Sequence, residues 1–301
     1  MHQIKHPDWL TIPASSDKTM GRVKRLLDRG GLHTVCESAN CPNVGECFAN
    51  CTCTFMILGN ICTRQCRFCA VEHGHPEPIN LDEPGAIALA AKKLNLKHVV
   101  ITTVTRDDMP DGGAGQFVAT INAIHKELPK ASIEVLISDL KGQSESLIEI
   151  LQAKPDIINH NIETVPRLYK VVRPQASYSR SLHMLKWIGM WRDGIVSKSG
   201  LMLGLGETFD EIVNVLHDLR KVDCDIVTLG QYLSPSPKHV PIERFVHPDE
   251  FKKIEKIGLE MGFLAVSAGP LVRSSYNASH TYKSILKKKT EDRGVKNHGH
   301  C

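Results

Sequence analysis

Three cysteines, Cys62, Cys66 and Cys69, are spaced C-x3-C-x2-C directly after an apolar run of the chain. Three thiolates can bind three irons of a four-iron cluster and leave the fourth iron without a protein ligand. Electron-transfer clusters normally have four cysteine ligands, and structural zinc sites also have four ligands. The missing fourth ligand therefore predicts an iron that is open to a small molecule. A zinc site with His73 or His75 as the fourth ligand is the alternative.

Another triplet, Cys36, Cys41 and Cys47, is the first in chain order; it is spaced C-x4-C-x5-C and is again one ligand short of four. The N-terminus has no apolar signal region, so we expect a cytoplasmic protein in a reducing compartment. In a reducing compartment, clustered cysteines are more often metal ligands than disulfide partners. Four further cysteines are interpreted as small apolar or incidental residues: Cys51, Cys53, Cys224 and Cys301.

Composition is that of an ordinary globular chain. Of 301 residues, 42% are hydrophobic and 23% are charged. No stretch approaches the roughly 20 unbroken apolar residues of a membrane span. A formal net charge of +4 is too small to argue for a nucleic-acid partner. We therefore expect neither a membrane nor a nucleic acid as a partner.

The elements that must position the cysteines alternate between short apolar runs and longer helical patterns. The predicted strands are Thr54–Leu58, His98–Thr103, Ile133–Ile137, Asp156–Asn159, Ser199–Leu203 and Asp225–Leu229, with a possible strand at Phe263–Ser267. The predicted helices between them are Glu83–Leu94, Gly115–Leu128, Ser144–Gln152, Ser179–Trp191 and Phe209–Lys221. This alternation predicts an α/β fold with a parallel sheet, a partial TIM-type (β/α)6 barrel. A doubly wound open sheet is the structural alternative. In a barrel, the loop after the first strand lies on the active face.

Three segments are predicted along the chain. Residues 1–53 form an N-terminal extension with the first triplet and a helix at Asp17–Arg29, for which Asp17 is the expected N-cap. Residues 54–281 form the barrel core, with one more helix at Asp249–Met261. Residues 282–301 form a basic tail that we expect to be frayed and flexible.

The C-x3-C-x2-C spacing, with Phe68 just before the last cysteine, resembles the motif of the radical S-adenosylmethionine (SAM) enzymes. In that family the open iron binds the amino and carboxylate groups of SAM. An electron from the cluster splits the sulfonium bond, and the resulting 5′-deoxyadenosyl radical removes a hydrogen atom from an unactivated carbon. The resemblance implies this chemistry and a barrel of the radical SAM type.

The first triplet and several other segments resemble the lipoyl synthases, a family within that superfamily. The segments are 54–59, 159–165, 231–236 and 270–276. In these enzymes a serine of the Arg-Ser-Ser-Tyr motif is the fourth ligand of an auxiliary cluster, and by position this is Ser275. Serine oxygen is a harder donor than thiolate and can let go of iron more easily. Without the resemblance, Ser274 and Ser275 would be interpreted as a turn or helix cap.

The resemblance also implies a reaction, its cofactors and its partners. Two sulfur atoms are inserted at carbons six and eight of an octanoyl chain on a lysine of a carrier protein. The cofactors are SAM and two 4Fe–4S clusters, of which the auxiliary cluster is consumed as the sulfur donor. Cys62, Cys66, Cys69 and Ser275 would be catalytic. The expected carrier is a 2-oxoacid dehydrogenase acyltransferase subunit or a glycine cleavage H protein, and the expected electron donor is a flavodoxin or ferredoxin.

Five residues are candidates to bind SAM. Asn161 and Glu163 would meet its ribose or its amine, and Arg173 would meet its carboxylate, since guanidinium pairs well with carboxylates. Gly204 and Glu207 belong to a glycine-rich stretch that resembles the SAM-binding pattern of the superfamily, where backbone can approach a ligand closely. Each of the five could equally have a structural role.

Two positions depart from the family pattern, and two other functions stay open. Thr105 stands where we expect an aspartate before Arg106, and Asn50-Cys-Thr-Cys53 stands where we expect Gly or Ala with Thr. One alternative is another radical SAM sulfur-inserting enzyme with an auxiliary cluster. The other is a structural metal-binding module, which would have four ligands per site close together in the sequence.

Overall fold

A computed structural model describes residues 7–11, 18–50, 52–191 and 193–296. Its main sheet has eight strands in the order β1-β2-β5-β6-β7-β8-β9-β10, and every neighbouring pair is parallel except β1 with β2. The strands are β1 His33–Thr34, β2 Thr54–Ile57, β5 His98–Thr103, β6 Ser132–Leu136, β7 Ile157–Asn159, β8 Val196–Leu203, β9 Ile226–Gln231 and β10 Ala265–Gly269. A small second sheet pairs β3 Ile61–Cys62 with β4 Glu72–His73.

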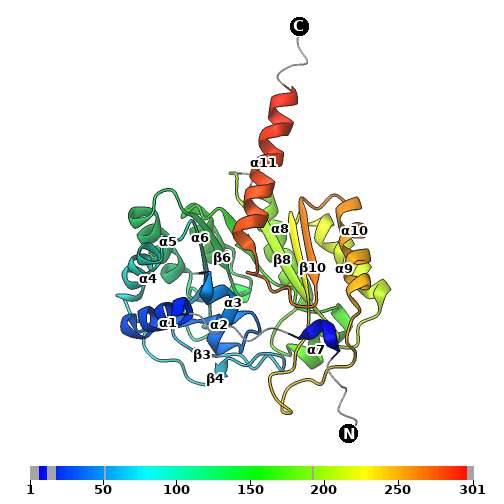
Figure 1. The fold of residues 1–301 in the computed structure, drawn as a ribbon, viewed down its shortest axis with the longest axis horizontal. Helices are drawn as coiled ribbons and strands as arrows, with labels where there is room; N and C mark the ends of the chain where they lie inside the picture. Colours follow the sequence, from blue (N-terminus) through cyan, green and yellow to red (C-terminus); the bar gives the residue numbers. More distant parts are fainter. Residues whose placement is uncertain (1–6, 12–17, 51, 192, 297–301) are drawn as a thin grey trace.

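Helices follow most of the parallel strands and lie at the periphery of the sheet (Figure 1). In chain order the α-helices are α1 Lys18–Gly30, α2 Val35–Ser38, α3 Val44–Ala49, α4 Glu83–Lys93, α5 Ala114–Glu127, α6 Ser144–Gln152, α7 Tyr169–Val172, α8 Tyr178–Met190, α9 Phe209–Lys221, α10 Pro248–Glu260 and α11 Ala278–Lys296. Their starts follow local chemistry. For example, α9 begins with a capping box in which Thr208 and Glu211 each accept a backbone N–H of the other.

The predicted partial barrel is confirmed. All six predicted apolar runs are parallel strands, and the possible strand near residue 265 is a seventh, β10. Strand order follows chain order without a reversal, which excludes the doubly wound alternative. Among the described residues β10 forms no ladder with β1, so the barrel is open along one side.

The sequence did not predict β1, and this short strand positions the first triplet. His33 and Thr34 pair with Met56 and Phe55 of β2. The Thr34 hydroxyl then caps α2 by accepting the backbone N–H of Glu37 at 3.3 Å. Helix α2, with Cys36, therefore starts beside the first parallel strand. Helix α1 has the predicted extent within one residue, and its expected N-cap Asp17 lies outside the described residues.

The prediction of a frayed tail from Tyr282 onward was wrong for most of that segment, because α11 runs to Lys296. Tyr282 and Ile285 are buried against Ile157, Val196 and Ile226, which begin or lie near the start of three parallel strands. Two buried side chains three residues apart lie on one face of a helix. In a lysine-rich stretch this short apolar pattern was too weak to predict the helix. The second half of α11 projects away from the barrel in Figure 1. No helix in the described part of the chain is long and apolar enough to cross a membrane.

Candidate active site

A cavity of about 380 Å³ opens at the ends of the parallel strands, within the usual size of small-molecule sites. Both cysteine triplets line it, as does the segment 272–276. The structure therefore brings together two motifs and a C-terminal segment that are far apart in the sequence. The predicted site residues that line the cavity are Cys36, Cys41, Cys47, Cys62, Cys66, Cys69, Asn161, Glu163, Arg173 and Ser275.

The loop with Cys62, Cys66 and Cys69 is bonded to several neighbouring loops. Thr63 N donates to Thr105 O at 3.0 Å after β5, and Arg67 N donates to Val172 O at 2.8 Å after β7. The His239 ring contacts the carbonyl of Cys69 at 3.0 Å after β9. A loop held on three sides keeps its cysteines oriented before any metal arrives.

Thr105, the first departure from the family pattern, contributes through its backbone. Its N–H donates to Cys62 Sγ at 3.3 Å, and the N–H of Arg64 donates to the same sulfur at 3.4 Å. Two main-chain N–H groups therefore converge on the Cys62 sulfur. Because both contacts use main-chain atoms, the identity of the side chain at Thr105 has no bearing on them.

Arg64 is a residue of this loop that sequence reasoning missed. Its guanidinium donates to Asp107 at 2.6 and 2.9 Å and to Asp139 at 2.6 Å, and its side chain is 4% exposed. Burial alone would raise the pKa of Asp139, but the hydrogen bond and charge of Arg64 lower it below its usual range. The cysteine loop is thus fixed to the loops after β5 and β6 by a buried ion-pair network.

The first triplet is bonded to the C-terminal motif by contacts that join the two ends of the chain. The buried Asn43, between Cys41 and Cys47, donates to Leu271 O at 2.8 Å. Tyr276 donates its hydroxyl proton to Glu46 at 3.3 Å. Sequence reasoning missed Asn43, whose partner is 228 positions away. These contacts bring the Arg-Ser-Ser-Tyr segment to the first triplet.

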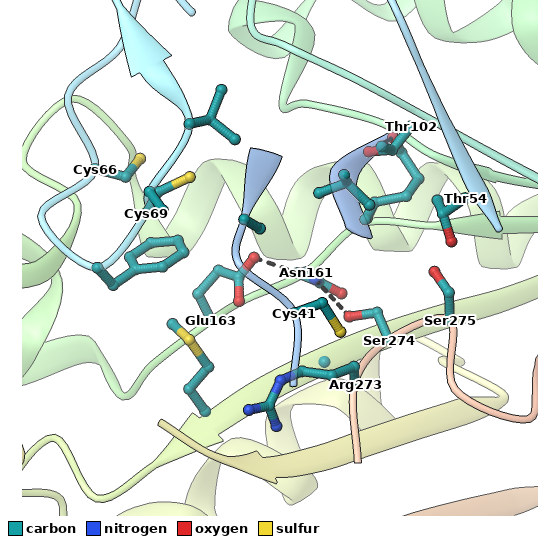
Figure 2. Close-up of a pocket in the computed structure, with 18 of the residues that line it drawn as sticks. Cys41, Thr54, Cys66, Cys69, Thr102, Asn161, Glu163, Arg273, Ser274 and Ser275 are labelled. Carbon is teal, nitrogen blue, oxygen red and sulfur yellow. Dashed lines mark hydrogen bonds between the residues drawn. The ribbon is translucent and has the colours of Figure 1, made fainter. Parts of the chain in front are cut away.

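The two serines of that segment face different surroundings (Figure 2). Ser274 Oγ accepts a hydrogen bond from Asn161 Nδ2 at 2.8 Å. The hydroxyl of Ser275 is directed away from Asn161, on the side where Thr54 lies. The Cys36 thiol is hydrogen-bonded to that same threonine. The choice of Ser275 over Ser274 as the ligand stays a prediction, with which these orientations agree.

The donor set fits iron–sulfur clusters. Burial raises the pKa of Cys36 and Cys66 to about 11 and that of Cys47 and Cys69 to about 12. The charge of another thiolate of the same triplet adds to each rise. Such buried thiols favour a cation that displaces their protons. Among the described residues no three His, Cys, Asp or Glu side chains are close enough to hold a single metal ion.

Asn161, Glu163 and Arg173 are adjacent in the cavity wall after β7. Arg173 donates to the backbone carbonyls of Asn161 and Ile162 at 2.9 and 3.2 Å, and its Nε is buried without a partner in the described structure. Burial raises the pKa of Glu163, which has a φ of +67°. A non-glycine residue in this left-handed region stores strain of order 1–3 kcal/mol, a common feature of ligand sites. The three residues thus offer an acid, an amide and a cation to a polar ligand.

Gly204 and Glu207 do not line the cavity. The Glu207 carboxylate accepts the N–H of Gly204 at 2.6 Å and that of Leu205 at 2.9 Å. Gly204 has a φ of +99°, and a Cβ there would lie 2.3 Å from Gln231 Nε2. Their predicted direct contact with SAM has no support in this geometry, because each is engaged in shaping the turn after β8.

Of the remaining cysteines, the structure describes Cys53 and Cys224. Cys224 is fully buried in the apolar core, and its thiol donates to Ile226 O at 3.3 Å. Cys53 is also buried in the core and reaches the cavity wall. Cys51 and Cys301 lie outside the described residues.

Comparison with known proteins identifies the superfamily. The model of the radical SAM superfamily matches residues 56–219. Among solved structures, the [FeFe]-hydrogenase maturase HydG superposes with a TM-score of 0.56 at 14% identity over 88% of this chain and 70% of its own. SuiB of Streptococcus suis, solved with S-adenosylmethionine, superposes with a TM-score of 0.53 at 11% identity over 83% of this chain and 55% of its own. These two share the fold.

Curated relatives are much closer in sequence. A lipoyl synthase of Caldanaerobacter subterraneus subsp. tengcongensis is 54% identical over 91% of this chain and 96% of its own length. Those of Caldicellulosiruptor bescii and Pseudomonas fluorescens are 51% and 49% identical over 95% and 93% of this chain, covering 98% and 83% of their own lengths. With both cysteine triplets in one cavity of a radical SAM barrel, the chain belongs to the lipoyl synthase family.

Proposed function

We propose that this protein inserts two sulfur atoms at carbons six and eight of an octanoyl chain attached to a lysine of a carrier protein. The observation that carries the proposal is that both cysteine triplets and the segment of Ser275 line one cavity. A radical formed at one end of such a cavity can reach a carbon that a sulfur source at the other end can then bond. Acid–base catalysis could not activate these carbons, since unactivated methylene groups have no proton acidic enough for a base to remove.

The cofactors of this family are SAM and two 4Fe–4S clusters. We propose that Cys62, Cys66 and Cys69 hold the cluster that binds SAM. Cys36, Cys41, Cys47 and Ser275 would hold the auxiliary cluster. When bound, these groups supply the electron that cleaves SAM and the sulfur atoms that reach the product.

The residues after β7 would orient SAM. Arg173 has a buried Nε free to pair with the carboxylate of SAM in the described structure, and Asn161 and Glu163 are placed to meet its amine or ribose. Gly204 and Glu207 would act through the shape of the turn after β8.

The carrier would enter with its octanoyl-lysine arm. Apolar side chains in the cavity wall would bind the octanoyl chain: Met56, Val104, Ile137, Leu201, Met202 and Leu233. Each methylene that they bury contributes roughly 0.8 kcal/mol. We propose a 2-oxoacid dehydrogenase acyltransferase subunit or a glycine cleavage H protein as the carrier, and a flavodoxin or ferredoxin as the electron donor.

The test uses anaerobically reconstituted protein with SAM, a reductant and an octanoylated carrier peptide. Cys62→Ala should abolish formation of 5′-deoxyadenosine. Cys41→Ala should retain part of that cleavage and form no carbon–sulfur bond. Cys224→Ala, a buried cysteine outside the cavity, is the matched control and should keep about eight irons per chain and both activities.

Two outcomes would contradict the proposal. Equal loss of cleavage in Cys62→Ala and Cys41→Ala would refute the division between the two clusters. Cleavage of SAM by the wild-type protein without sulfur in the peptide would keep the radical chemistry and reject this substrate.

A further inference from the structure

We propose that Ser274 is a positioning residue that joins the SAM side of the cavity to the segment of Ser275. Asn161 Nδ2 donates to Glu163 Oε1 at 3.1 Å and to Ser274 Oγ at 2.8 Å (Figure 2). One amide group therefore connects a residue expected to contact SAM with the neighbour of the expected iron ligand. The inference rests on the proposed roles of Asn161 and Ser275.

The orientation of the Asn161 amide follows from its partners. Asn161 Nδ2 is the donor both to the Glu163 carboxyl and to the Ser274 hydroxyl, so the NH2 group of the amide faces these two oxygens. The amide oxygen of Asn161, a residue that is 9% exposed, is buried and accepts no hydrogen bond in the described structure. Leaving a buried acceptor unpaired is unfavourable. A ligand that brings an N–H or O–H to this oxygen would be bound and would fix the amide in place.

The backbone of β8 leaves room for this pair. At Gly200, a Cβ would lie 2.8 Å from Asn161 Oδ1 and 3.1 Å from Ser274 Oγ. A glycine inside a strand commonly marks a place where another group comes close. The absence of a side chain at Gly200 thus lets the end of β7 meet the segment after β10.

The segment of Ser274 is bonded to the N-terminal extension on both sides. Leu271 O accepts from Asn43, and the hydroxyl of Tyr276 donates to Glu46. Ser274 lies between these contacts, and its side chain is bonded across to Asn161. A ligand that fixes Asn161 would therefore also fix Ser274 and, through the adjacent peptide bond, Ser275.

The consequence is a coupling between SAM binding and ligation of the auxiliary cluster by Ser275. Such a coupling is reciprocal, so bound SAM should favour the ligated serine, and the ligated serine should favour SAM. Departure of the products of SAM cleavage would, by the same coupling, loosen Ser275.

Two measurements without turnover test this coupling. The first is the dissociation constant of SAM for the reconstituted protein, by calorimetry. The second is the rate at which a ferrous chelator removes iron from the auxiliary cluster, in a full-length variant with Cys62, Cys66 and Cys69 replaced by Ala. Ser274→Ala should raise the dissociation constant of SAM about fivefold and increase the rate of iron release about fivefold, the effect of one net hydrogen bond. Asn161→Ala should also speed iron release, and the double variant should release iron no faster than either single one.

Ser279→Ala is the matched control, because this half-buried serine does not line the cavity, and both quantities should be unchanged. Iron release unaffected by Asn161→Ala would overturn the proposal, as would a Ser274→Ala protein with unaltered SAM affinity. If Ser274→Ala does not fold, the Asn161→Ala result decides. Ser275→Ala distinguishes a failure of the proposed ligand from a failure of the proposed coupling. Normal iron release in that variant would refute Ser275 as the ligand.

Discussion

Replacing Arg64 by methionine keeps most of the side-chain volume and removes the charge that pairs with two aspartates. Arg64 and Asp139 have side chains that are 4% and 0% exposed. Removing one partner of a buried ion pair costs roughly 3–5 kcal/mol. Since Arg180 stays 3.2 Å from Asp139, we expect the lower end, about 3 kcal/mol.

Thermal unfolding of the metal-free protein measures this loss. At roughly 2–4 °C per kcal/mol for a chain of this size, Arg64→Met should lower the Tm by about 6–12 °C. The folded-state pKa of Asp139 is lowered, so its contribution is present above its unfolded pKa and is lost as the pH falls through its folded value. The difference between the two proteins should therefore shrink in acid.

Arg167→Met is the matched control, because its pair with Glu211 involves a side chain that is 55% exposed. Exposed pairs contribute about 0–1 kcal/mol. An Arg64→Met protein as stable as Arg167→Met would refute the reasoning. So would an Arg64→Met protein that binds a full complement of iron with an unaltered SAM affinity, since Arg64 would then not position the cysteine loop.

Two further predictions concern residues near the cavity. Burial, with the charge of Arg173, lowers the pKa of His160 to about 4, against about 6.5 unfolded, so acidification from pH 7 to pH 5 should cost about 2 kcal/mol of stability through this group. Urea unfolding at both pH values should show this slope, and His160→Gln should flatten it; an identical slope in the variant would contradict the assignment. Glu207→Gln should lower stability by about 1–3 kcal/mol, because the charge that accepts two buried N–H groups is lost, and should leave SAM affinity within about twofold. Weaker SAM binding at unchanged stability would instead make Glu207 a direct contact.

The barrel and the cluster loop were predictable because their signals are local. Buried parallel strands appear as continuous apolar runs, and three of the cluster cysteines lie within eight positions of one another. Only the family resemblance assigned a role to the first triplet and to Ser275, and these roles stay predictions. The strand β1 has two residues, too few for any periodicity, and in α11 the buried Tyr282 and Ile285 stand in a lysine-rich stretch.

What remained hidden are contacts between distant residues. Arg64 meets Asp139 across 75 positions, Ser274 meets Asn161 across 113 and Asn43 meets Leu271 across 228. The sequence around each of these residues predicts only a loop and gives no sign of its distant partner. Conversely, the glycine-rich stretch with Gly204 and Glu207 resembles a ligand-binding motif, although both residues are engaged with their own turn. A motif identifies a turn, and only the folded chain shows which side of the turn faces the cavity.

The central claim is that the cluster held by Cys36, Cys41, Cys47 and Ser275 supplies the sulfur. The protein should be reconstituted with isotopically heavy sulfide, freed of excess sulfide, and given one turnover with SAM, reductant and an octanoylated carrier peptide. Mass spectrometry should find two heavy sulfur atoms in the peptide, and none when Cys41→Ala is used. Light sulfur in the product, or heavy product from Cys41→Ala, would contradict the account.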